Sequence, residues 1–118
     1  MFLKLLRAKI HRAAVTQSEV DYVGSITIDQ DLLDASGILP YEDVLVADLN
    51  NGHRFHTYVI VGDRGTGTIC INGAAAKLAS VGDRIIIMAF AYVAPDEVKG
   101  LLPSVVLVDE KNRIIRKL

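Results

Sequence analysis

The sequence lacks several features that would assign it to a familiar class. It has no tryptophan and only one cysteine, Cys70, so no disulfide can form within the chain. Thirteen basic residues stand against fourteen acidic ones, and the net charge of -1 provides no field for holding nucleic acid or an anionic membrane. No apolar run approaches the ~20 residues needed to span a bilayer. These absences favour a cytoplasmic protein whose partners are small molecules or copies of itself.

What is present is ordinary globular material. The chain has 118 residues, of which 51% are hydrophobic and 23% charged, enough for one domain with its own core. The basic N-terminal stretch MFLKLLRAKIHRAAV resembles an organelle transit peptide in composition. However, Lys9, His11 and Ala13 alternate with Ala8, Ile10 and Arg12 at a strand period, so we expect a first strand there. Cys70 lies in the apolar run TICI and is expected to pack, not to react.

The rest of the sequence predicts short strands separated by turns. Asp29 is a candidate N-cap for a short helix that ends at Gly37, and Asn51-Gly52 is a strong hairpin signal. Residues 73–79 are expected to form one or two helical turns. The run 84–93 is so continuously apolar that we expect burial on both faces. The further predicted strands are 25–28, 44–49, 54–61, 68–71 and 105–108. This pattern favours a mainly β, barrel-like domain with short helices at its corners.

Several common chemistries are disfavoured. The loop GDRGTG lacks the Lys-Ser/Thr ending of a phosphate-binding loop, so a tight turn is the better interpretation. His53 and His56 are three residues apart on a predicted strand and would face opposite sides, so they would not ligate one metal, and no metal site is expected. No GxSxG elbow surrounds Ser25, which argues against a conventional serine hydrolase.

The Gly24-Ser25 pair in YVGSITID permits a different use of a serine. The Ser25 hydroxyl can attack the carbonyl of the preceding residue, and glycine offers the least steric hindrance to that attack. Elimination from the resulting ester, followed by hydrolysis, would leave a pyruvoyl group at a new N-terminus and divide the chain into 1–24 and 25–118. The dipeptide alone is not specific, because most Gly-Ser pairs are turns.

The surrounding motifs make the chain similar to a known family. KIHRAAVT, YVGSITID, LLDASGILPYE, NGHRFHTYVI, INGAAAKLASVGD and RIIIMAF occur in the order and spacing of bacterial aspartate alpha-decarboxylase. That family makes β-alanine for pantothenate with a pyruvoyl cofactor. The resemblance covers roughly residues 1–110 and implies a double-psi β-barrel, a homotetramer and self-cleavage at Gly24-Ser25. Whether cleavage needs a helper protein stays open.

The resemblance also implies roles for individual residues. The pyruvoyl group derived from Ser25 would condense with the amine of L-aspartate and accept the electrons released with carbon dioxide. Arg54 would clamp a substrate carboxylate through its planar fork, with Lys9 as a second contact. Tyr58 would return a proton after decarboxylation. Each has a plainer alternative, since Arg54 and Lys9 suit a solvated surface and Tyr58 suits packing.

The remaining implied site residues are less specific. Thr57 faces away from Tyr58 by strand period, which fits the family's use of this position near the Gly24 carbonyl during processing. His11 alternates onto the Lys9 face, and either residue is equally consistent with an exposed charge. Tyr22 resembles a pocket-lining residue. The family also uses the helix entry for substrate binding and for the ester intermediate, although an Ala-rich helix start is an equally simple account: Asn72, Gly73, Ala74 and Ala75.

Two departures from the family pattern and one rival hypothesis complete the sequence analysis. Ala47 is small where the family often has an aromatic residue, and the C-terminal KNRIIRKL differs from the longer tails expected. The rival hypothesis is a non-catalytic barrel that binds a ligand or partner, with Ser25 as an ordinary turn serine. Such a binder would have no need for the combined set of family residues.

Overall fold

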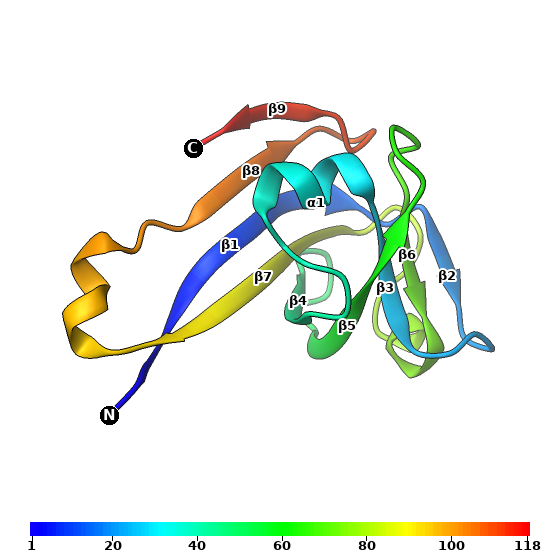
Figure 1. Ribbon diagram of the computed structural model, residues 1–118. Coiled ribbons are helices and arrows are strands. Elements are labelled where there is room, and N and C mark those ends of the chain that lie inside the picture. Colours follow the sequence, from blue (N-terminus) through cyan, green and yellow to red (C-terminus); the bar gives the residue numbers. More distant parts are fainter.

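Nine strands form one hydrogen-bonded sheet in the computed structural model, which describes all 118 residues (Figure 1). Their order across the sheet is β2-β6-β3-β5-β4-β7-β1-β8-β9. The strands are β1 Leu3–Ala14, β2 Gln17–Glu19, β3 Ser25–Asp29, β4 Asp43–Asp48, β5 Arg54–Gly62, β6 Ile69–Asn72, β7 Arg84–Val93, β8 Ser104–Val108 and β9 Ile114–Lys117. The expected hairpin at Asn51-Gly52 connects β4 to β5.

Parallel and antiparallel pairings are mixed in this sheet. β3 runs parallel to β5 and β1 parallel to β8, whereas β3 with β6, β4 with β5, and β7 with both β1 and β4 are antiparallel. Parallel neighbours need crossover connections, so the chain cannot be a simple meander. The predicted mainly β domain with short helices is confirmed, and the architecture is the expected double-psi β-barrel.

Alternating apolar residues on the strands build the core. Isoleucines dominate it, and each fully buried one contributes roughly 1.5–3 kcal/mol relative to exposure. Fully buried examples come from β1, β3, β6 and β7: Ile10, Ile26, Ile28, Ile69, Ile71, Ile85 and Ile87. Residues between them on the same strands point to the opposite face of the sheet. Side chains on that second face, which we call the outer face, are available for chemistry and contacts.

Strand β7 corrects one expectation. The sequence predicted burial on both faces of residues 84–93, but burial alternates along the strand: Ile85 and Ile87 are fully buried, whereas Ile86, Met88 and Phe90 are partly exposed. The prediction was wrong for the single chain because the chain covers the outer face of β7 only in part. A continuous apolar run therefore indicates here an apolar outer surface, not a second core.

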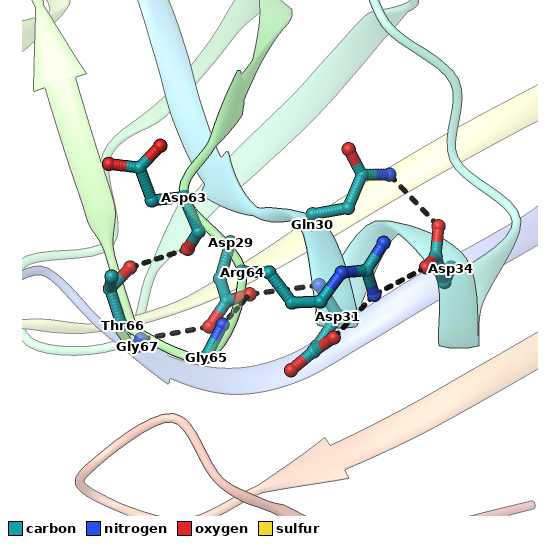
Figure 2. A network of polar contacts seen from close by, with 9 residues as sticks. All are labelled: Asp29, Gln30, Asp31, Asp34, Asp63, Arg64, Gly65, Thr66 and Gly67. Atoms are coloured by element: carbon teal, nitrogen blue, oxygen red, sulfur yellow. Dashed lines mark hydrogen bonds and ion pairs between the residues drawn. The ribbon is translucent and has the colours of Figure 1, made fainter.

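Helix α1 (Gln30–Ser36) begins and ends as predicted. Asp29 caps it by accepting a hydrogen bond from the Asp31 N–H at 2.8 Å, and Gly37 ends it in the left-handed conformation at φ 80°. The Asp29 carboxylate also accepts from the backbone N–H groups of Gly65 (3.0 Å) and Gly67 (2.8 Å) (Figure 2). This buried side chain therefore ties the glycine-rich loop to the helix start, which confirms that the loop is a turn.

The short helices and some strands differ from the expected boundaries. The turns expected at 73–79 are a 3-10 helix, η1 (Gly73–Lys77), and a second one, η2 (Pro95–Gly100), fills the connection between two prolines. Strands β2 and β9 were not predicted. Strand β1 lies in the N-terminal stretch where a first strand was expected and is interrupted by bulges, one of them where Arg12 adopts φ 67°. None of the helices combines the length and apolar character required to cross a bilayer.

Replacing Asp29 with alanine tests the importance of this cap for stability. The change removes the acceptor of three backbone N–H groups, and we expect it to lower the free energy of unfolding by at least about 2 kcal/mol. Asp34→Ala is the control, since exposed Asp34 interacts only with Gln30 and Arg64 and its loss should change stability little. Urea titration would measure both, and equal effects would contradict the assignment.

Candidate functional site

Ser25 stands at the boundary between an exposed turn and a buried strand. It is the first residue of β3 and only 4% exposed, whereas Gly24 before it is exposed and Val23 is 83% exposed. The peptide bond between Gly24 and Ser25 therefore joins an accessible turn to a fixed strand. A reaction at this bond could separate Gly24 from Ser25 without moving Ser25.

Asn72 is the principal side-chain partner of Ser25. The antiparallel pairing of β3 with β6 sets the two residues opposite each other, and Asn72 Nδ2 donates a hydrogen bond to Ser25 Oγ at 3.1 Å. The Ser25 hydroxyl lies 3.5 Å from the Val23 carbonyl oxygen, a long contact. Asn72 is 7% exposed, so this amide is fixed by its protein neighbours. The arrangement holds Ser25 Oγ within a buried polar contact directly after Gly24.

Gly73 leaves room for the turn that precedes Ser25. Its φ is +73°, and a Cβ added there would lie 2.6 Å from Gly24 Cα, 2.9 Å from Gly24 N and 3.2 Å from the Tyr22 carbonyl oxygen. The first two distances are too short for any real Cβ, so the backbones of residues 22–24 and Gly73 contact each other because Gly73 carries no side chain. A Cβ at Gly24 would meet only the Asn72 carbonyl oxygen at 3.9 Å, so the contact requires glycine at position 73 and not at position 24.

Tyr58 and Thr57 lie on the strand next to Ser25. The parallel pairing of β3 with β5 includes Ile26 opposite Val59, so extending the register back by one residue puts Tyr58 level with Ser25. Thr57 directly precedes Tyr58 on β5, as Gly24 directly precedes Ser25, but Gly24 lies in the turn outside β3. The pairing of β5 with β4 has no register shift, so Tyr58 and Thr57 face opposite sides as expected.

Arg54 shares the outer face of β5 with Tyr58 but lies farther from Ser25. Four residues of strand separate it from Tyr58, which is roughly 13 Å. The side chain is exposed and takes part in no ion pair of the structure. Arg54 is therefore free to bind an anion, but its own chain does not bring it against Ser25.

Lys9 and His11 are also remote from Ser25. They share the outer face of β1, opposite Met88 and Ile86 of β7. The order β1-β7-β4-β5-β3 puts four strand spacings between them and Ser25, roughly 19 Å measured along the curved sheet. Burial, together with the positive charges of Lys9, Arg12 and Arg84, lowers the pKa of His11. His11 Nδ1 is buried without a hydrogen-bond partner.

The other expected residues surround the Gly24 turn. Tyr22 is 60% exposed and contributes its carbonyl to the contact with Gly73. Ala74 in η1 is exposed, whereas Ala75 is half-buried and packs against the core. Ala47 is 8% exposed and pairs with Arg54. Because its side chain is small, it protrudes little from the outer face beside Arg54.

The histidines of the hairpin region interact separately. His53 Nδ1 lies 3.3 Å from the Leu78 carbonyl oxygen, and His56 Nδ1 lies 3.3 Å from Asp43 Oδ1. β5 begins at Arg54, so His53 precedes the strand to which the sequence assigned it. No group of three or more His, Cys, Asp or Glu side chains comes together in the structure.

Sequence reasoning missed two neighbours of the Ser25 amide contact. Cys70 Sγ donates to Asn72 Oδ1 at 3.2 Å, and Asn72 Nδ2 also donates to Thr27 Oγ1 at 3.3 Å. Cys70 is buried as expected, but it packs with its thiol directed at a site residue. The signal available in the sequence was the strand period, since residues 70 and 72, like 25 and 27, share a face.

Comparison with known proteins gives a consistent result over nearly the whole chain. A family model described as Aspartate decarboxylase matches residues 1–115. The Aspartate 1-decarboxylase of Lactiplantibacillus plantarum is 57% identical over 117 residues, covering 99% of this chain and 90% of the relative. Those of Ruminiclostridium cellulolyticum (57% over 117 residues) and Caldicellulosiruptor saccharolyticus (53% over 116 residues) cover 99% and 98% of this chain and 91% of each relative.

A pair of glycine variants tests the contact between Gly73 and the turn. Gly73 and Gly82 both have positive φ, but a Cβ at Gly82 would have no atom within 4 Å. We expect Gly82→Ala to cost about 1–2 kcal/mol for its backbone conformation alone. Gly73→Ala should cost a further 1–3 kcal/mol, about the usual range for overpacking, because Gly24 must move. Chemical denaturation of the uncleaved chains would measure the difference, and equal costs would contradict the contact.

Proposed function

The chain belongs to the aspartate decarboxylase family, and on that premise we propose that it decarboxylates L-aspartate to β-alanine with a pyruvoyl group made from its own Ser25. The observation that carries the proposal is the buried hydrogen bond from Asn72 to Ser25 Oγ beside the exposed Gly24. The product would serve pantothenate biosynthesis in the cytoplasm.

The residues around Ser25 fit the formation of this group. A serine that is to lose its bond to the preceding residue must stay in place while that residue departs. Ser25 is held in β3 between β5 and β6, and Gly24 lies in an exposed turn. Glycine at position 24 offers the least steric hindrance to attack on its carbonyl carbon, and the absence of a side chain at Gly73 makes room for the turn that contains it.

Self-cleavage needs no metal or second enzyme in its bond changes. Ser25 Oγ forms a bond to the Gly24 carbonyl carbon, the carbon–nitrogen bond breaks, and the hydroxyl proton passes to the nitrogen. Loss of the Ser25 Cα proton then breaks the Cβ–Oγ bond, and Gly24 leaves as a carboxylate. Cβ of the resulting enamine takes up a proton, and water then replaces the nitrogen, which departs as ammonia. The ketone that results supplies an electron sink for decarboxylation when a substrate amine is bound to it.

The two products of cleavage would stay together. Residues 1–24 contain β1, which pairs with β7 from Leu3 to Ala14 and with β8, and β2, which pairs with β6. Loss of one peptide bond removes none of these hydrogen bonds. The mature protein would therefore be a β chain (1–24) and an α chain (25–118) in one folded domain.

Tyr58 and Thr57 would serve successive reactions. Tyr58 extends along the same face as Ser25 and is 37% exposed, so its hydroxyl can reach a substrate and donate a proton to the carbon that has lost carbon dioxide. Thr57 would donate to the Gly24 carbonyl oxygen during cleavage. Asn72, Gly73, Ala74 and Ala75 would form the wall against which the substrate binds, with Tyr22 at its rim.

The basic residues of the site would come from a second copy of the chain. Lys9, His11 and Arg54 lie on the outer face, and no strand pairing or hydrogen bond within one chain joins any of them to Ser25. The same face exposes apolar parts of β7, namely Ile86, Met88 and Phe90. Apolar surface beside a basic cluster suits a homotetramer in which one copy supplies Ser25 and its neighbour supplies the carboxylate clamp.

The rival hypothesis, a non-catalytic barrel that binds a ligand or partner, predicts an intact chain with no turnover. It gives no role to Gly24, where the fold has room for a Cβ, directly before the buried Ser25. A helper protein for maturation would be compatible with a purified chain that cleaves by itself and with one that does not.

Two variants separate cleavage from decarboxylation. We expect Ser25→Ala to give a single intact mass and no activity, because no hydroxyl can attack Gly24. Tyr58→Phe should give the two fragments at the normal rate but reduce kcat about 10²- to 10⁴-fold, since only proton return is lost. Denaturing mass spectrometry and β-alanine release measure the two effects. Activity in Ser25→Ala, or an intact wild-type chain that no extract can process, would exclude the proposal.

Complementation tests whether the site is shared between copies. Arg54→Ala and Ser25→Ala should each be inactive alone, but co-expression should restore part of the activity. In mixed oligomers, some sites then combine an intact Ser25 from one copy with an intact Arg54 from another. Co-expression of Arg54→Ala with Lys9→Ala is the control, since both changes fall on the same side of the shared site and should restore none. No recovery in the first pair would place Arg54 and Ser25 of one chain in the same site.

A further inference from the structure

Four side chains form a buried polar cluster on β3 and β6. The antiparallel register sets Ser25 opposite Asn72 and Thr27 opposite Cys70, and all four point to the outer face. Asn72 Nδ2 donates to Ser25 Oγ (3.1 Å) and to Thr27 Oγ1 (3.3 Å), and Cys70 Sγ donates to Asn72 Oδ1 (3.2 Å). Every hydrogen-bonding end of the Asn72 amide is therefore directed at one of its three neighbours.

The orientation of the Asn72 amide determines whether Ser25 Oγ faces an N–H donor or a carbonyl oxygen. A hydroxyl both donates and accepts, so Ser25 and Thr27 would tolerate either end of the amide. A thiol is a weak hydrogen-bond donor and also only a weak acceptor. With the carbonyl oxygen of Asn72 toward Cys70, both N–H groups reach hydroxyl oxygens. In the reverse orientation, one N–H would face only sulfur. The two hydroxyls accept both orientations of the Asn72 amide, and Cys70 therefore favours the one in which Nδ2 faces Ser25 and Thr27.

The thiol is suited to act as the donor. Cys70 is 6% exposed, and burial together with the negative charge of Glu19 raises its pKa, so the proton stays on sulfur. A buried thiol with this partner does not behave as a nucleophile. Its position two residues before Asn72 on the same strand keeps the two side chains adjacent.

We propose that Cys70 is a positioning residue for the self-cleavage at Gly24-Ser25, because its S–H group orients the Asn72 amide so that Nδ2 donates to Ser25 Oγ. Cys70 touches no reacting atom and acts only through Asn72. The inference rests on the self-cleavage proposed above and adds to it a residue that the sequence assigned to packing.

The N–H on Ser25 Oγ would be most useful in the second half of the reaction. When the Cβ–Oγ bond breaks, Oγ takes the electron pair and becomes an oxygen of the Gly24 carboxylate. The Asn72 N–H then donates to an oxygen that gains negative charge, and such hydrogen bonds are stronger than those to neutral oxygens. A carbonyl oxygen of Asn72 at the same place would repel that charge. Loss of the orienting thiol should therefore slow cleavage without preventing folding.

Three substitutions at Cys70 test the inference on the uncleaved full-length chain. Cys70→Ser keeps a donor, Cys70→Val keeps an apolar side chain without a donor, and Cys70→Ala removes both. Cleavage at a fixed temperature is followed by denaturing mass spectrometry as the loss of the intact chain. We expect Val and Ala to slow cleavage about three- to tenfold and Ser to cleave near the wild-type rate, since one hydrogen bond of ordinary strength is lost in Val and Ala and kept in Ser.

A purely structural role would give a different order. If Cys70 only filled space, Val would cleave like the wild type and the polar Ser would be slow, and that result would overturn the inference. Melting temperatures of the uncleaved chains identify any variant that fails to fold. Should Ala be such a variant, the comparison of Ser with Val decides. Equal cleavage by all variants would also overturn the inference while leaving the proposed function intact, whereas a wild type that never cleaves would contradict both.

A double-mutant cycle tests the route through Asn72. In an Asn72→Ala background there is no amide to orient, so Cys70→Val should cause no further slowing. Additive slowing in the double variant would mean that Cys70 acts on Ser25 by another path and would overturn the inference. The Asn72→Ala chain must itself cleave slowly enough to be followed over hours, which the same mass measurement establishes.

Discussion

The site depends on the way β3 is held from both sides. It pairs antiparallel with β6 and parallel with β5, so the position of Ser25 relative to Asn72 is fixed by backbone hydrogen bonds and not by the turn before it. The turn is then free to be exposed and to contain a glycine. Because Gly73 follows Asn72 directly, the same pairing also brings a residue without a side chain against Gly24. One strand pairing thus supplies both the polar contact and the space.

The outer face divides the site's chemistry into two groups. Near β3 and β6 it is polar and nearly neutral, with a hydroxyl, an amide and a thiol in contact. On β1 and β5 it carries the basic residues Lys9, His11 and Arg54, and the apolar side chains of β7 lie between β1 and β4. A substrate with two carboxylates and one amine would need both kinds of surface. Under the proposed function, the two groups would come from different copies of the chain.

Local signals in the sequence predicted local structure well. Asp29 and Gly37 determine the ends of α1 through their own backbone contacts, and Asn51-Gly52 determines a hairpin whose strands follow at once. The prediction failed where the answer depends on distant partners. β2 and β9 have only three and four residues and exist because β6 and β8 offer them edges. The burial of β7 was predicted wrongly for the same reason. An apolar run does not show whether the second face of the strand is buried against other residues of the same chain.

The candidate site shows the same limit. Strand period correctly separated Thr57 from Tyr58 and joined Lys9 to His11, because alternation needs no knowledge of neighbouring strands. It gave no information on which strands are adjacent, so the remoteness of Lys9 from Ser25 required the sheet order. The thiol of Cys70 was likewise invisible as a donor, because its acceptor is defined only by side-chain geometry.

The position of β1 affects how the chain would fold before and after cleavage. Residues 1–24 contribute a strand that lies between β7 and β8 in the middle of the sheet order, not at its edge. An uncut chain reaches this arrangement in a unimolecular reaction, because the turn at 20–24 keeps the pieces together. Two separate pieces would have to find each other in solution, so their reassembly would depend on protein concentration. Cutting at Ser25 would thus make folding a step that each molecule completes efficiently only once, before it matures.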